Sequence, residues 1–99
     1  MDVNDIRREM VGAIVTIGAA RDLGRNHPSV RVLAESVMGL LSDATNEALD
    51  AHAEACQCCA GRVVAMLGIF EQGYRLAADV SAELMVPITP GQVLLAGCQ

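Results

Sequence analysis

The sequence contains no tryptophan and no lysine, and its only aromatic side chains, apart from histidine, are Phe70 and Tyr74. Single-stranded nucleic acids are held largely by stacking their bases on aromatic rings, so we expect no such platform here. The seven basic residues are all arginine and are outnumbered by twelve acidic residues, which gives a net charge of −5. Because binding to phosphate backbones depends on basic residues, we expect no direct nucleic-acid binding. An acidic chain is better suited to a basic protein partner.

Long apolar runs are also missing. The uncharged stretches 10–20 and 84–99 are either too short to span a membrane or interrupted by proline and glycine. Residues 7–20 loosely resemble a signal peptide, because two arginines precede an apolar segment. The acidic residues around those arginines favour an amphipathic helix instead. We therefore expect a cytoplasmic protein without a membrane segment.

The apolar periodicity is helical throughout, and no segment alternates as a strand would. We expect residues 1–99 to form a single all-α domain with a modest core. The pattern predicts a small helical bundle of three main helices, with a possible short C-terminal helix. The predicted helices cover residues 4–23, 28–41, 43–85 and 92–96.

Residues that typically begin or end helices support these boundaries. Gly24 is a plausible helix stop, and Pro28 suits the first turn of the second helix. Ser42 can cap the third helix with its hydroxyl group. Glycines inside the third helix lower its helix propensity, so a bend or break there is compatible with the pattern.

The four cysteines are unevenly placed, since Cys56, Cys58 and Cys59 crowd together and Cys98 stands alone. This is a poor framework for disulfides and favours metal binding or redox chemistry. Spacings of four and three residues place His52, Cys56 and Cys59 on one helical face.

One imidazole and two thiolates can converge on one ion, and zinc prefers four such ligands in a tetrahedron. The only other histidine, His27, begins the second predicted helix. It would complete the set if the second and third helices pack antiparallel. We predict a zinc site formed by His27, His52, Cys56 and Cys59. The competing interpretation is that His52, Cys56 and Cys59 lie on the buried face of a core helix, where thiols serve as small apolar side chains.

We expect different roles for the other two cysteines. Cys58 lies off the ligand stripe and is a candidate redox thiol that pairs with Cys56 or Cys59 after metal loss. Cys98 is expected to be an exposed spectator. No carboxylate stands out as a catalytic base, because Glu54 points away from the ligand face. We therefore do not expect an enzyme.

The ligand motif resembles that of the zinc-binding anti-sigma factor family, which is H-x3-C-x2-C with a further histidine about 25 residues upstream. The matching features extend over residues 27–67 and include His27-Pro28 and the Leu41-Ser42 turn. The resemblance implies a small helical domain that sequesters an extracytoplasmic-function sigma factor. It also implies release of that partner on thiol oxidation. Residues 1–26 would form an extra N-terminal helix.

Two alternatives remain open. Small all-helical metal-responsive repressors of the CsoR and RcnR type share the spacing of His27, His52 and Cys56. That resemblance accounts better for residues 1–26, but such repressors bind DNA through basic surfaces. The other alternative is a metal-free, self-associating bundle. Its homodimer would pack along a stripe with heptad spacing, which comprises Val63, Phe70, Ala77 and Leu84.

Overall fold

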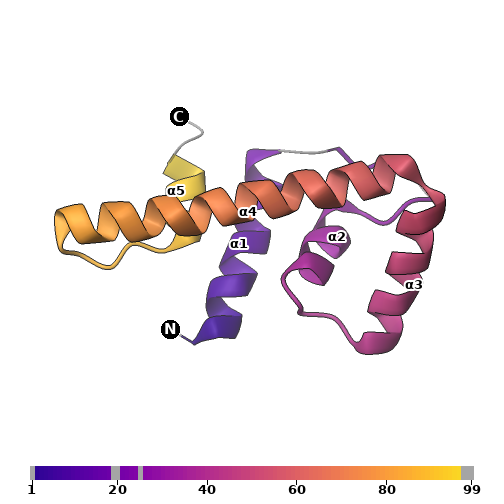
Figure 1. The fold of residues 1–99 in the computed structure, drawn as a ribbon, viewed down its shortest axis with the longest axis horizontal. Helices are drawn as coiled ribbons and strands as arrows, with labels where there is room; N and C mark the ends of the chain where they lie inside the picture. Colours follow the sequence, from indigo (N-terminus) through magenta and orange to yellow (C-terminus); the bar gives the residue numbers. More distant parts are fainter. Residues whose placement is uncertain (1, 19–20, 25, 97–99) are drawn as a thin grey trace.

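The computed structural model describes residues 2–18, 21–24 and 26–96, which contain five α-helices and no strand. The all-α prediction is confirmed, with one more helix than expected. The helices are α1 (Val3–Ile17), α2 (Val30–Val37), α3 (Asp43–Ala55), α4 (Gln57–Leu84) and α5 (Pro90–Ala96). Figure 1 shows α4 running along the whole molecule, with α3 turned away from its first turn at one end. The helices α2 and α5 each contact α4, and α1 contacts α2 and α5.

Three predicted helix ends are wrong for local reasons. The first helix ends at Ile17 and not near residue 23, because Gly18 takes a left-handed conformation with φ of 65°. The second helix begins at Val30, because the Ser29 hydroxyl accepts the backbone N–H of Val32. Pro28 therefore precedes the cap and does not occupy the first turn. This helix also ends at Val37, four residues earlier than predicted.

The predicted third helix over residues 43–85 is two helices. The chain bends by 116° between α3 and α4, and the joint is Cys56, whose backbone is extended (φ −129°, ψ 105°). The glycines at 61, 68 and 73 lie inside α4 and do not break it. The predicted cap at Ser42 is confirmed, since its hydroxyl accepts the backbone N–H of Thr45.

Among the helices that the structure describes, no single one has the length and apolar character needed to cross a membrane. The two helices α3 and α4 would meet those criteria only when taken together across their sharp bend.

The hydrophobic core lies where α1, α2 and the middle of α4 meet. Met66 and Phe70 of α4 are almost fully buried there. The residues they join from the other helices are Met10, Val11, Ile14, Val30, Leu33 and Ala34. Because Phe70 and Ala77 are buried by the chain itself, the centre of the predicted self-association stripe is already occupied. Leu84, at its end, remains exposed.

The short helix α5 packs against α1 and α4. The Thr89 hydroxyl donates a hydrogen bond to the carboxylate of Glu9, which ties the start of α5 to α1. Gly91 lies directly against Glu9, and a Cβ atom at this position would lie 2.5 Å from Oε1 of that carboxylate. The absence of a side chain at residue 91 therefore permits this close approach.

We predict that Gly91→Ala lowers the free energy of unfolding by about 1–2 kcal/mol, because the new methyl group displaces Glu9 from Thr89. The matched control is Gly12→Ala in α1, where a Cβ atom would have no neighbour within 4 Å. This control should raise stability by up to about 1 kcal/mol through helix propensity alone. Urea titrations followed by circular dichroism measure both changes. Equal effects of the two substitutions would contradict the proposed contact.

Candidate metal centre

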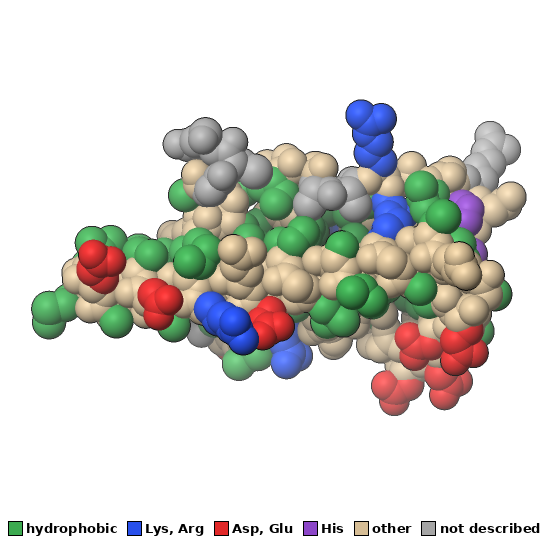
Figure 2. All heavy atoms as spheres, turned by 45° about the horizontal axis from the view of Figure 1, so that its top comes forward, with side chains coloured by type: hydrophobic (Ala, Val, Ile, Leu, Met, Phe, Trp, Pro, Cys, Tyr) green, Lys and Arg blue, Asp and Glu red, His purple; other side chains and the backbone are tan. Residues whose placement is uncertain are grey.

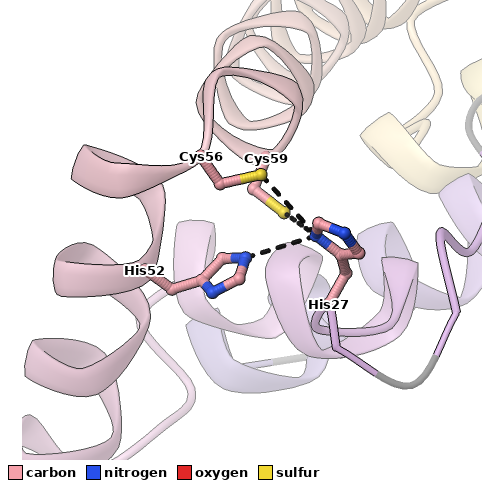
Figure 3. Close-up of side chains that lie close together, drawn as sticks. All are labelled: His27, His52, Cys56 and Cys59. Carbon is pink, nitrogen blue, oxygen red and sulfur yellow. Dashed lines mark hydrogen bonds between the residues drawn. The ribbon is translucent and has the colours of Figure 1, made fainter.

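Three separate segments bring four potential ligands together at the end of the molecule that carries α3 (Figure 3). His27 comes from the loop before α2, and His52 comes from the last turn of α3. Cys56 lies at the joint, and Cys59 lies in the first turn of α4. One donor atom from each residue can be chosen such that all four lie within 4.8 Å of one another. The cluster contains the same four residues that the sequence predicted.

The route by which these residues meet differs from the predicted one. We expected His52, Cys56 and Cys59 on the face of one continuous helix. Instead, the extended backbone at Cys56 turns the chain, so that His52 and Cys59 approach from two different helices. The start of α3 is held separately, because the Ser36 hydroxyl donates a 2.8 Å hydrogen bond to the side-chain oxygen of Asn46.

The separations between Nδ1 of His27 and the other three donor atoms agree with a tetrahedral zinc site. Nδ1 of His27 lies 3.3 Å from Nε2 of His52, and 3.6 and 3.5 Å from Sγ of Cys56 and Cys59. With ordinary zinc–nitrogen and zinc–sulfur bond lengths, the edges of a tetrahedron are about 3.3 Å between nitrogens and about 3.6 Å between nitrogen and sulfur. The three edges that start at Nδ1 of His27 therefore match a zinc tetrahedron, and the remaining donor pairs lie within 4.8 Å of one another.

Hydrogen bonding alone does not explain this cluster. Three possible partners surround Nδ1 of His27, but a ring nitrogen carries either one proton or one lone pair. It can form one good hydrogen bond and not three. The two imidazole rings also meet edge to face, at an interplanar angle of 86°, and do not stack. A cation at the centre would satisfy all four donor atoms together.

Burial separates the candidate ligands from their neighbours in the sequence. Cys59 is fully buried, and the other three members of the cluster are half-buried. Cys58 is exposed and lies outside the cluster, as expected for a thiol that does not share the ion. Glu54 is also exposed. Cys98 lies outside the described residues.

The pKa values of the two thiols in the cluster are shifted in opposite directions. Cys56 precedes α4, and although its side chain makes no regular capping hydrogen bond, the backbone N–H of Cys59 lowers the pKa of its thiol. Burial raises the pKa of Cys59, and its nearness to Cys56 adds to this increase. The positive charge of Arg62 acts in the opposite direction on Cys59.

Arg62 is a functional candidate that the sequence analysis missed. Both terminal nitrogens of its guanidinium group are buried, and neither has a hydrogen-bond partner among the described residues. A buried, unpaired cation is costly unless negative charge lies nearby. Arg62 follows Cys59 by one helical turn, and this spacing in the sequence could have identified it. Deprotonated thiolates at the cluster would supply the missing negative charge.

No protein-family model matches the chain, and no curated protein or solved structure matches it significantly.

We expect the purified, reduced protein to hold about one zinc ion per chain. Changes to groups outside the ligands typically weaken metal binding by about 10–100-fold, so loss of a ligand in Cys56→Ser should exceed that range. Cys58→Ser is the matched control and should retain the metal. Elemental analysis and competition with a chelator measure both variants. Equal zinc loss in the two variants would contradict the ligand assignment.

Arg62→Met should stabilise the metal-free protein but weaken its binding of zinc. Removing an unpaired buried cation should raise the stability of the metal-free protein. It should also weaken zinc binding by roughly tenfold, because the thiolates lose a nearby positive charge. Thermal unfolding with and without zinc gives both values. An unchanged gain in melting temperature on adding zinc would show that Arg62 does not support the site.

Proposed function

We propose that this chain is a zinc-stabilised regulator that acts by binding another protein, in the manner of an anti-sigma factor. Its partner would be an extracytoplasmic-function sigma factor in the cytoplasm. The observation that carries the proposal is the convergence of His27, His52, Cys56 and Cys59, whose donor atoms lie within 4.8 Å of one another. The resemblance of the H-x3-C-x2-C motif and its upstream His-Pro to that family supplies the partner class.

A structural role for zinc fits this donor set better than a catalytic one. Four protein donors complete a tetrahedron, whereas a catalytic zinc keeps one position open for water or substrate. The only acidic residue between His52 and Cys59 is Glu54, which is exposed on the surface of α3. In our proposal, the bound ion fastens the loop before α2 to the joint between α3 and α4.

Thiol oxidation would release the partner. One thiolate attacks a peroxide, which leaves a sulfenic acid on that sulfur and expels hydroxide. A second thiolate displaces hydroxide from the oxidised sulfur and forms the disulfide. The two sulfurs lose two electrons, and the peroxide becomes two water molecules after protonation. Cys56 and Cys59 are the reacting pair, or the exposed Cys58 replaces one of them.

A metal-responsive repressor is the second candidate, because His27, His52 and Cys56 have the spacing of its motif and lie in one cluster. The charge of −5 argues against a DNA-binding surface. The interruption between α2 and α3 also argues against this candidate, since such repressors have an unbroken middle helix.

The test is a titration of the zinc-loaded protein with a purified extracytoplasmic-function sigma factor encoded beside its gene. We expect a stoichiometric complex that peroxide dissociates and a thiol reductant restores. The control is Gly12→Ala, which should bind equally well. No complex, together with salt-sensitive binding to a specific operator DNA, would overturn the proposal in favour of the repressor. Unchanged zinc content and helicity after peroxide would overturn the redox switch alone.

A further inference from the structure

The helix α3 contributes no buried residue to the protein, although it is 13 residues long. Isolated helices of that length are marginal in water, and most owe their stability to packing of an apolar face. Two of the contacts that hold α3 lie near its ends. The bond between Ser36 and Asn46 holds the start, and His52 joins the metal cluster near the other end. In the middle of α3, Leu49 is only half-buried, so the chain covers this apolar side of the helix incompletely.

A groove of about 220 Å³ separates α3 from α2 and the start of α4. Its apolar wall residues are Leu33, Val37, Leu49, Ala53, Val63 and Leu67. Leu67 is 51% exposed on the rim, and Val64 beside it is 68% exposed. Small-molecule pockets usually range from about 300 to 1,000 Å³, so this groove is better suited to anchoring side chains of another protein.

The outer surface of α3 carries most of the excess negative charge. It has no arginine and four exposed acidic residues, which are Asp43, Glu47, Asp50 and Glu54. Asp50 also lines the groove. Figure 2 shows acidic side chains gathered at the end of the molecule that carries the histidines. An occupant of the groove therefore meets apolar walls bordered by negative charge on one side.

We propose that this groove binds a basic amphipathic helix of the partner protein. Leucine-like side chains at three- and four-residue steps would enter the groove, and lysine or arginine beside them would face α3. The inference rests on the proposed function and adds the chemistry of the partner. Because His52 attaches α3 to the rest of the site, zinc binding sets the position of one groove wall. Removal of zinc would therefore weaken docking.

The probe is a fluorescein-labelled helical peptide of leucine and lysine, titrated with the zinc-loaded full chain and followed by fluorescence anisotropy. Leu67→Gln should weaken binding by roughly tenfold, because one anchor contact is lost. The matched control is Leu84→Gln, also on α4 and 59% exposed, which should stay within about twofold of the wild type. Circular dichroism establishes that both variants keep their helicity.

Charge is tested with a second matched pair of variants. Neutralising Glu47, Asp50 and Glu54 together as Gln, Asn and Gln should weaken binding and reduce its dependence on salt. The same neutralisation of Glu71, Asp79 and Glu83, exposed on α4, is the control and should change binding much less. A peptide with glutamate in place of lysine should not bind.

Two results would overturn the groove proposal. One is equal weakening by Leu67→Gln and Leu84→Gln, and the other is equal binding of the lysine and glutamate peptides. The proposed function can fail separately. If the sigma factor forms no complex but the peptide follows the expected pattern, the groove stands and the sigma-factor assignment fails. If the sigma factor binds equally to wild type and Leu67→Gln, its complex uses another surface and the groove proposal fails.

Discussion

The convergence of two imidazoles and two thiols to within 4.8 Å of one another is the constraint on which this end of the molecule depends. Nδ1 of His27 meets donor atoms that lie 25 to 32 residues further along the chain. Structural zinc can contribute roughly 10 kcal/mol or more of folding free energy, which is comparable to the whole stability of a small domain. The position of α3, and with it the groove, would follow from the bound ion.

The rest of the molecule is built differently. There, α1, α2, α4 and α5 share an apolar core around Met66 and Phe70, and α3 contributes nothing to it. Local stability in proteins follows such differences in buried contacts. The core would thus keep its fold while the metal end opens, which is the property that a regulator released by loss of its metal requires.

The sequence was sufficient to predict the helical class and the four clustered residues, because periodicity and residue spacing carry that information. It could not predict the break at Cys56, since one helical stripe is compatible with both a continuous helix and two helices meeting at an angle. The end of α1 at Gly18 was missed because another glycine, Gly24, was an equally good stop signal. The burial of the two terminal nitrogens of Arg62 and the groove beside Leu67 depend on tertiary packing, which no local pattern encodes.

X-ray absorption at the zinc edge of the reduced, zinc-loaded protein tests the central claim most directly. The account predicts two sulfur ligands at about 2.3 Å and two imidazole nitrogens at about 2.0–2.1 Å around each ion. A first shell with three sulfurs would mean that Cys58 or Cys98 replaces a histidine. A shell made mainly of oxygen would mean that these four residues do not hold the metal, and either result would contradict the account.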